Sequence, residues 1–270
     1  MPGKVSKQYK SRVVKIHQDF YPKETILLKE EIISPEIIQD VILSPEISPE
    51  TEIIQDIPKS SFNKYFDKIF VINLDRRPDR WEKCQEELKK HNIVAERFSA
   101  IDGETLNKEH FKPNCILSKG EIGCCMSHAA VIKLAQSYNY SKILILEDDV
   151  TFSENAGVIF QQNINNIPNN WQMLYLGGNH LVEPITIYPR AKLARIKRTY
   201  TTSSYAVRNV DRFLPALIAS LEQFKEPADV CYCKFQMGCF CYSFYPGICF
   251  QTPGYSDIVG GFTDYFGIIR

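Results

Sequence analysis

The stretch Lys142–Val150, KILILEDDV, constrains the fold more than any other part of this 270-residue chain. Its apolar residues are consecutive rather than alternating, and three acids follow them. A strand that is apolar on both faces is typical of a parallel sheet covered by helices on each side. The stretch therefore predicts a buried central strand of an α/β layered domain.

A second apolar, β-branched run, Lys68–Leu74, predicts another buried strand. The polar stretch after it carries apolar residues three and four positions apart over Trp81–Leu88, which marks one face of a helix. Pro78 suits the first turn of that helix, and we expect Asp75 to cap it.

Further strands and helices alternate along the chain. Ala95–Gly103 and Trp171–Gly178 predict strands, and a turn followed by a helix is expected from Ser118. This order predicts a mostly parallel sheet with helices on both faces, and such sheets bind ligands at the carboxyl ends of their strands. Polar or glycine residues stand at four of these ends: Asn73, Asp102, Glu147–Asp149 and Gly177–Asn179.

Charge is distributed unevenly along the chain, although the formal net charge is zero. Residues 1–29 carry seven bases and two acids (+5), residues 30–58 carry eight acids and no base (−8), and the remainder carries +3. The acidic stretch repeats PEIIQD as TEIIQD and is rich in proline. We expect residues 1–62 to be a low-complexity, disordered tail and residues 63–270 to be the folded domain. The alternative is a binding segment whose Ile-Ile pairs dock on a partner or on the domain itself.

Compartment and partner class follow from what the sequence lacks. No apolar run reaches the ~20 residues of a membrane span, and no apolar segment follows the basic start, so a cytoplasmic location is expected. Nine cysteines, an odd number, predict reduced thiols, most of them buried. The Cys-x-Cys pairs Cys231/Cys233 and Cys239/Cys241 suit one face of a strand better than a zinc site. No basic helix with interleaved aromatics indicates a nucleic-acid partner.

The acids Glu147, Asp148 and Asp149 carry the clearest chemical signal. Strand alternation places Glu147 and Asp149 on one side and Asp148 on the other. Three adjacent carboxylates repel one another unless a cation or hydrogen bonds offset the charge. Mg²⁺ and Mn²⁺ prefer carboxylate oxygens and often share substrate phosphates. A cap or a loop salt bridge is the alternative interpretation.

A series of segments in fixed order resembles glycosyltransferase family 25, which includes bacterial lipooligosaccharide galactosyltransferases and procollagen galactosyltransferases. The matching segments are FVINLDRRPDR (Phe70–Arg80), ERFSAIDG (Glu96–Gly103), LSKGEIGCCMSH (Leu117–His128), ILILEDDV (Ile143–Val150), WQMLYLGG (Trp171–Gly178), TTSSYAVRN (Thr201–Asn209), PAD (Pro227–Asp229) and GYSDI (Gly254–Ile258). The first four are specific in combination, and residues before Lys68 have no match.

The resemblance implies a GT-A-like nucleotide-binding sheet and transfer of a hexose, most often galactose, from a UDP-sugar to a glycan or protein hydroxyl with inversion. It also implies Mn²⁺ or Mg²⁺ at the acidic cluster, with Asp149 as the likeliest direct ligand and Glu147 at the ribose or a metal-bound water. Asp148 is expected to be structural.

The same resemblance implies a set of donor-binding residues, which are Asn73, Leu74, Arg76, Asp102, Gly103, Glu121, His128 and Glu147. The spacing of Glu121, Ser127 and His128 predicts that they face one side of a helix. An Asx-turn is the alternative for Asp102, and a structural histidine is the alternative for His128. Arg76, Arg77 and Arg80 follow the first strand and are candidates for the donor diphosphate, and a solvated helix charge is the alternative for Arg80.

Inversion by direct displacement needs a general base on the acceptor side. Asp229 is the first candidate and Asp257 the second. A binding module of the same fold without turnover, and a phosphotransfer or phosphohydrolase domain built on the acidic cluster, are the competing functions.

Overall fold

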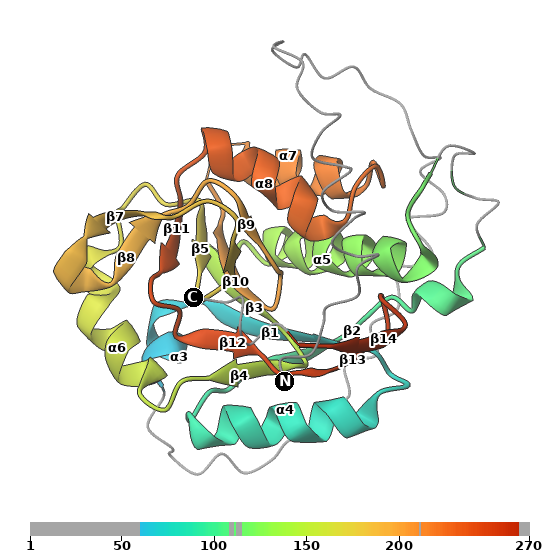
Figure 1. Cartoon of the computed structure of the whole chain (residues 1–270), viewed down its shortest axis with the longest axis horizontal. Helices are drawn as coiled ribbons and strands as arrows, with labels where there is room; N and C mark the ends of the chain where they lie inside the picture. The colour runs from blue at the N-terminus through green and yellow to red at the C-terminus, as the bar shows by residue number, and fades with distance from the viewer. Residues whose placement is uncertain (1–59, 108–110, 112–114, 211, 265–270) are drawn as a thin grey trace.

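The computed structural model describes residues 60–107, 111, 115–210 and 212–264 (Figure 1). The expected tail, residues 1–62, lies outside the described residues except for its last three. These belong to the folded body, because α3 (Ser61–Tyr65) begins there and Phe62 is fully buried. The expected boundary between residues 62 and 63 therefore falls inside a helix.

The central element is an eight-stranded sheet with strand order β2-β1-β3-β10-β5-β11-β8-β7. Its strands are β1 (Lys68–Asn73), β2 (Glu96–Ser99), β3 (Lys142–Glu147), β5 (Met173–Tyr175), β7 (Ile185–Tyr188), β8 (Leu193–Arg195), β10 (Ser204–Arg208) and β11 (Cys241–Phe244). β1 pairs in parallel with β2 and β3, and β5 pairs in parallel with β11. β10 and β8 run antiparallel to both of their neighbours. The sheet is therefore mixed, with the other six strands sharing one direction.

Helices cover both faces of this sheet, as expected (Figure 1). They are α3, α4 (Pro78–Lys90), α5 (Lys119–Ser137), α6 (Ala156–Asn163), α7 (Phe213–Leu221) and α8 (Ala228–Gly238). Alternate β1 residues enter two separate cores: Phe70 and Ile72 pack with α5, α7 and α8, and Ile69 and Val71 with α3, α4 and α6. Both faces of the apolar strands are thus buried, which explains their continuous apolar sequences.

Short elements complete the described chain. They are η1 (Gly103–Thr105), η3 (Ile164–Asn166), η4 (Pro189–Ala191) and three two-stranded sheets formed by β4 (Val150–Phe152) with β12 (Cys249–Gln251), β6 (Asn179–His180) with β9 (Thr199–Tyr200), and β13 (Gly254–Ser256) with β14 (Gly261–Thr263). Among the described residues, no helix combines the length and apolar character needed to cross a bilayer.

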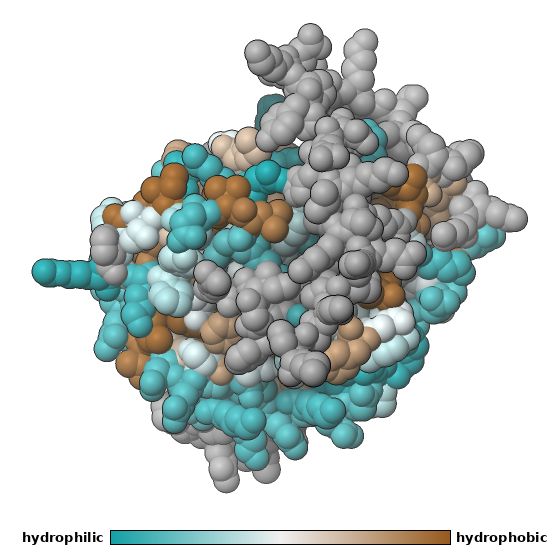
Figure 2. All heavy atoms as spheres, viewed as in Figure 1, coloured by the Kyte–Doolittle hydropathy of each residue, from teal (hydrophilic) through white to brown (hydrophobic). Residues whose placement is uncertain are grey.

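The start of α4 differs in one respect from the expectation. Pro78 occupies the first turn, but the residue before it, Arg77, is the N-cap and makes no side-chain cap bond. Asp75 instead accepts hydrogen bonds from Ser99 and Arg97 of the neighbouring strand. The outer side of α4 is charged, and Figure 2 shows this hydrophilic band along the bottom of the molecule.

The start of α5 is fixed by a capping box and by two glycines. Ser118 accepts from the Glu121 backbone, and the Glu121 carboxylate accepts from the Ser118 backbone. A Cβ on Gly103 would lie 2.2 Å from the Lys119 carbonyl oxygen, and one on Gly123 would lie 2.6 Å from the Ile101 carbonyl oxygen. Close backbone approach, rather than a tight turn, is therefore what Gly103 provides.

The expectation for the cysteine pairs is wrong at Cys231 and Cys233, which lie in helix α8 rather than in a strand. Cys239 caps that helix and Cys241 belongs to β11. All nine cysteines have free thiols, and five of them are buried.

Candidate functional site

Three parallel strands end at one edge of the sheet. Because β1, β2 and β3 run in the same direction, Asn73, Asp102 and the acidic cluster arrive at this edge from different parts of the sequence. Such an edge is where open α/β sheets bind ligands.

The acidic cluster is divided between two sides of this edge. β3 ends at Glu147, and Asp148 and Asp149 form the turn into β4. Both aspartates pair with Arg80 of α4, whereas Glu147 faces α5. The expectation that Glu147 and Asp149 share one side is wrong, because strand alternation applies only while the backbone stays extended.

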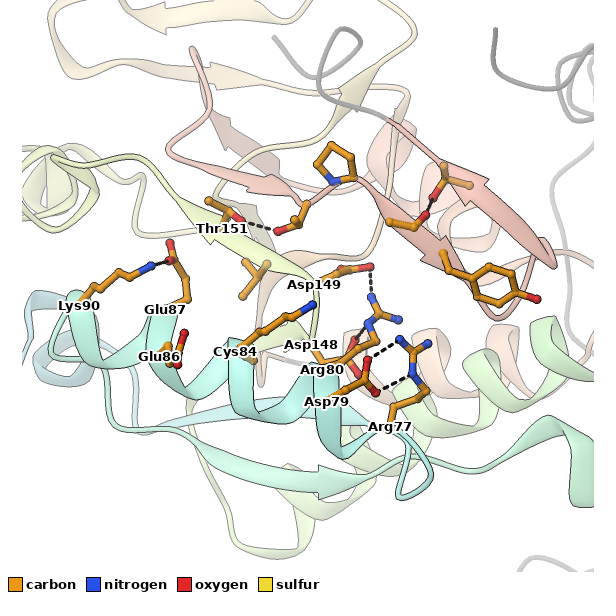
Figure 3. A pocket seen from close by; sticks show the side chains of 17 residues that line it. Arg77, Asp79, Arg80, Cys84, Glu86, Glu87, Lys90, Asp148, Asp149 and Thr151 are labelled. Atoms are coloured by element: carbon orange, nitrogen blue, oxygen red, sulfur yellow. Dashed lines mark hydrogen bonds and ion pairs between the residues drawn. The ribbon is translucent and has the colours of Figure 1, made fainter. Parts of the chain in front are cut away.

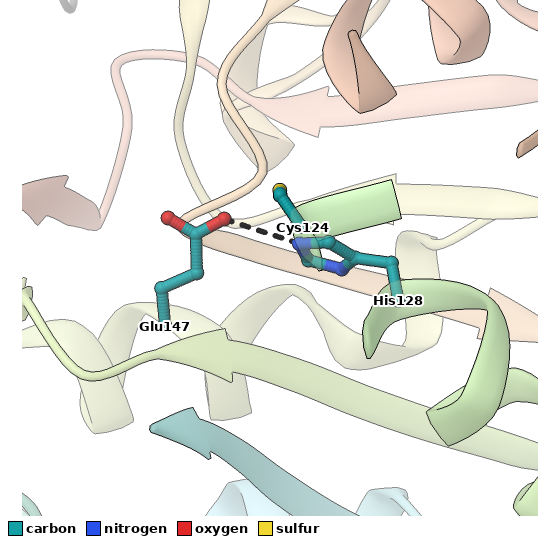
Figure 4. A group of neighbouring side chains, drawn as sticks. All are labelled: Cys124, His128 and Glu147. Carbon is teal, nitrogen blue, oxygen red and sulfur yellow. Dashed lines mark hydrogen bonds and ion pairs between the residues drawn. The ribbon is translucent and has the colours of Figure 1, made fainter. Parts of the chain in front are cut away.

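On the α5 side, Glu147 lies beside His128, with Glu147 Oε1 3.2 Å from His128 Nε2 (Figure 4). Thr202 donates a second hydrogen bond to the same oxygen. Burial alone would raise the pKa of Glu147, but the bonds from His128 and Thr202 outweigh it and hold that pKa below its ordinary value. Glu147 is therefore ionised at neutral pH.

The buried His128 ring is held from its other nitrogen. His128 Nδ1 lies 2.8 Å from the Tyr205 hydroxyl, which lies 2.7 Å from the Tyr232 hydroxyl. Cys124, one turn earlier on α5, presents its sulfur to the same place (Figure 4). His128 is thus a positioned, fully partnered histidine at the strand edge.

On the α4 side, Arg80 bridges the two aspartates (Figure 3). Its Nε lies 3.0 Å from Asp148 Oδ1, and a second guanidinium nitrogen pairs with Asp149 Oδ2. Asn73 donates to Asp148 over 2.6 Å and is itself nearly inaccessible. Asp148 is thereby tied to the framework, as expected for a structural residue.

Asp149 keeps one oxygen without a partner. Oδ2 also accepts from Gln251 over 3.0 Å, but the buried Oδ1 has no hydrogen-bond partner in the described part of the chain. Burial and the neighbouring Glu147 raise the pKa of Asp149 to about 6, against the opposing effect of Arg80. An unpartnered buried carboxylate oxygen is a ready position for a cation.

A cluster of arginines adjoins this turn. Asp257 accepts from Arg76 over 2.6 Å and from Arg77 over 2.5 Å, and Arg76 also donates to Asp102 over 2.7 Å. These arginines lower the pKa of Asp257 although burial opposes them. Asp102 Oδ1 also accepts a hydrogen bond from the Glu104 amide and so caps η1. This is the Asx-type contact that was the alternative to ligand binding for Asp102.

A pocket opens between α4, the turn after β3 and residues 252–255 (Figure 3). Its lining includes Arg77, Arg80, Asp148 and Asp149, so the arginines and the acidic turn share one solvent-connected space. Positive side chains beside a buried carboxylate suit an anionic ligand that arrives with a metal ion.

Asp229 lies in the first turn of α8. Its Oδ1 accepts from the Val230 amide over 2.8 Å, and the Thr201 amide donates to the same carboxylate. Loss of solvent raises its pKa to about 6, although these backbone bonds oppose the shift. Thr201 has φ 74°, a conformation that non-glycine residues rarely adopt.

The expected donor-binding residues are only partly brought together. Arg76, Asp102 and Asn73 lie at the edge described above, and Leu74 follows β1 there half-buried. The Glu121 carboxylate is used in the capping box, and Ser127 bonds the Gly123 carbonyl and the Ile101 amide. The carboxylate of Glu121 and the hydroxyl of Ser127 are thus used in local hydrogen bonds, whereas His128 reaches Glu147.

Several site residues were missed by the sequence interpretation. Gln251, Thr202, Tyr205 and Tyr232 all contact the site through side chains, and Cys124 joins it. The segment Thr201–Asn209 was noted, but its sequence gives no sign of which hydroxyls point inward.

The fold and this edge define an α/β domain with arginines and carboxylates gathered where parallel strands end. The model of glycosyltransferase family 25, described as an LPS biosynthesis protein, matches residues 66–214. The chain belongs to glycosyltransferase family 25.

Relatives within the family differ in what their names say about activity. Procollagen galactosyltransferase 2 of Homo sapiens is 27% identical over 235 residues, covering 72% of this chain and 37% of that protein. The glycosyltransferase 25 family member of Drosophila melanogaster is 34% identical over 137 residues, covering 43% and 22%. Inactive glycosyltransferase 25 family member 3 of Mus musculus is 26% identical over 186 residues, covering 63% and 30%. The chain thus spans little more than a third of the first relative's length.

Among solved structures, a glycosyltransferase involved in the glycosylation of the major capsid of PBCV-1 matches with a TM-score of 0.32 and 12% identity, covering 56% of this chain and 64% of that chain. A likeness of that size carries no argument about the site.

Proposed function

We propose that this chain is a metal-dependent, inverting glycosyltransferase that moves a hexose, galactose before glucose, from a UDP-sugar to a hydroxyl of a glycan or protein acceptor. The observation that carries the proposal is the unpartnered oxygen of Asp149, whose other oxygen pairs with Arg80, in a chain of glycosyltransferase family 25. The name of the human relative, procollagen galactosyltransferase 2, supports galactose as the sugar and a protein as one acceptor class.

The residues present fit a hard divalent ion such as Mn²⁺ or Mg²⁺. Asp149 Oδ1 is a buried carboxylate oxygen that lacks a partner among the described residues, and Asp149 lines a pocket that also contains Arg77 and Arg80. Asp149 would hold the ion, and a bound ion would offset the charge of the departing diphosphate. Glu147 Oε1 is already bonded by His128 and Thr202, so we assign Asp149 and not Glu147 to this ion.

We assign Arg76 and Arg77 to the diphosphate. Each guanidinium is held by Asp257, so the two are oriented in advance at the end of β1. Planar guanidinium groups suit phosphate oxygens better than lysine does. Asp102, which follows β2, holds Arg76 through Oδ2 and caps η1 through Oδ1, so we assign it to orienting Arg76.

Asp229 is the group we assign as general base. It would take the proton from the acceptor hydroxyl while that oxygen forms a bond to the anomeric carbon and the bond from that carbon to the UDP oxygen breaks. A carboxylate with a pKa near 6 is ionised at neutral pH and is more basic than an ordinary aspartate. Asp257, the second candidate, is unsuited because Arg76 and Arg77 occupy both of its oxygens.

A second function is favoured by one specific finding. Several relatives carry the word inactive in their names, including the mouse protein described above. The alternative is a nucleotide-sugar or glycan binding module that keeps the fold without turnover.

A panel of UDP-sugars with purified protein and Mn²⁺ tests both functions. We expect hydrolysis of one donor, UDP-galactose first, and a loss of about 100-fold or more in Asp149→Ala. Glu82→Ala, on the exposed side of α4, is the control and should retain activity. Donor binding without turnover in the presence of acceptors would favour the binding module, and absence of donor binding would contradict the transferase and leave only glycan binding for the module.

A further inference from the structure

Three potential metal ligands converge at the α5 side of the strand edge. The ligand atoms of Cys124, His128 and Glu147 all lie within 4.8 Å of one another (Figure 4). Cys124 and His128 are four residues apart on α5 and so share a face, and Glu147 ends β3 opposite them. The proposed transfer reaction uses none of these three groups.

We propose that Cys124, His128 and Glu147 bind a thiophilic divalent cation, with Zn²⁺ as the expected ion. A sulfur, an imidazole nitrogen and a carboxylate oxygen form a donor set that suits zinc and not the hard ions assigned to Asp149. In a tetrahedral zinc site such atoms lie about 3.4–3.6 Å apart, given zinc bond lengths of about 2.0–2.3 Å. His128 Nε2 and Glu147 Oε1 already lie 3.2 Å apart, close to that spacing, and the Cys124 sulfur lies within 4.8 Å of both.

The surroundings orient these groups as outer-shell partners orient metal ligands. The Tyr205 hydroxyl is 2.8 Å from His128 Nδ1, so His128 is able to donate from Nδ1 and offer a lone pair at Nε2. Tyr232 supports Tyr205, and Thr202 donates to Glu147. Both the imidazole and the carboxylate are therefore fixed before an ion arrives.

Three protein ligands leave one tetrahedral position for water or another oxygen ligand. In the described residues the group has these three members only. The ion would join α5 to the end of β3 at the sheet edge. The inference does not require sugar transfer, because it rests on the three ligand atoms alone.

Metal binding to the full-length, chelator-stripped chain tests the site. In competition with a chromophoric chelator, wild type should bind one equivalent of Zn²⁺ at this site. The Zn²⁺ affinity of Cys124→Ser at the site should be lower by about 100-fold or more, so that the chelator keeps that equivalent. Cys239→Ser is the matched control, since Cys239 is also half-buried, caps helix α8 and lies outside the group. It should bind as wild type does.

Co²⁺ gives a readout that does not depend on a variant's folding. Wild type loaded with Co²⁺ should show the thiolate-to-cobalt charge-transfer absorption in the near ultraviolet, and Cys124→Ser should lack it. Absence of that absorption in wild type, or equal Zn²⁺ binding by wild type and Cys124→Ser, would overturn the proposal. UDP-sugar hydrolysis is not part of either measurement, so its failure would leave this result unaffected.

Discussion

Asp149 and Asp229 are the two carboxylates whose surroundings disfavour their charged form most clearly at the site. In both, loss of solvent raises the pKa to about 6, because the hydrogen bonds around each carboxylate, together with Arg80 beside Asp149, offset only part of the cost of burying its charge. Asp149 has Arg80 and Gln251 on one oxygen, and Asp229 has backbone amides. Natural proteins tolerate such local costs mainly where function needs them.

Asp149→Asn should therefore stabilise the metal-free protein at pH 7.5. A folded-state pKa about two units above the unfolded value makes ionisation cost on the order of 3 kcal/mol in the fold. The folded state binds the extra proton between pH 4 and 6, so this cost grows as the pH rises through that window. The advantage of Asp149→Asn, measured by urea unfolding, should vanish near pH 4.

Asp257→Asn is the contrasting variant. Arg76 and Arg77 lower the pKa of Asp257, so its charge stabilises the fold above the unfolded pKa, and that contribution is lost as the pH falls. Its replacement should lower the free energy of unfolding at pH 7.5. A destabilised Asp149→Asn, or an unchanged Asp257→Asn, would contradict the electrostatic account of this edge.

The pH dependence of UDP-sugar hydrolysis tests Asp229. A general base works only when ionised, so kcat/KM should fall about tenfold per unit below pH 6. The measurement is made at saturating Mn²⁺, because the metal competes with the proton on Asp149. Asp229→Asn should lower kcat by about 10²–10⁴-fold. A full-rate Asp229→Asn enzyme with the same acid limb would exclude Asp229 as the base.

At the scale of single elements, the contact between η1 and the start of α5 holds two parts of the site in register. Gly103→Ala would place a Cβ 2.2 Å from the Lys119 carbonyl oxygen, which is backbone and has little freedom to move. We expect a loss of about 2 kcal/mol or more in the free energy of unfolding, measured by urea denaturation.

Gly157→Ala in α6 is the matched control. Its Cβ would meet only the Ser61 hydroxyl at 3.7 Å, an ordinary contact, so the helix should gain about 0.5–1 kcal/mol. Equal effects of the two substitutions would mean that close packing does not explain Gly103.

Elements with a strong local pattern were predictable from sequence, whereas their ends were not. The apolar runs of β1 and β3 and the Pro78 start of α4 are found as expected. The turn after Glu147 was not predicted, because an uninterrupted run of acids has no periodicity that marks the end of a strand. A spacing of two residues suggested a strand for Cys231 and Cys233. That prediction failed because the same spacing also occurs within a helix.

At the scale of the molecule, the site depends on contacts between distant segments that no local pattern encodes. Asp257 meets Arg76 across 181 positions of the chain, and Gln251 meets Asp149 across 102. The sequence indicated both Asp257 and the arginines, but not that each neutralises the other. It is this pairing that makes Asp257 an orienting group for Arg76 and Arg77 instead of a base.

The extent of the folded body is the last whole-molecule question, and two truncations answer it. A chain that begins at Lys59 keeps Ser60, which caps α3 through the Asn63 amide, and keeps Phe62, which is fully buried against α6. It loses residues 1–58, whose net charge is −3 because residues 1–29 carry +5 and residues 30–58 carry −8. We expect its free energy of unfolding to match that of the full chain within about 0.5 kcal/mol.

A chain that begins at Asn63, the boundary expected from sequence, should be far less stable. It lacks the buried Phe62 ring, which contacts Phe152 and Phe160, and removal of such a ring costs about 3–5 kcal/mol. Loss of the Ser60 cap adds about 1 kcal/mol. Urea denaturation of both truncations measures the difference. If the chain beginning at Lys59 were destabilised as strongly as the other, residues 1–58 would contribute to the fold, and their Ile-Ile repeats would become candidates for docking on the domain.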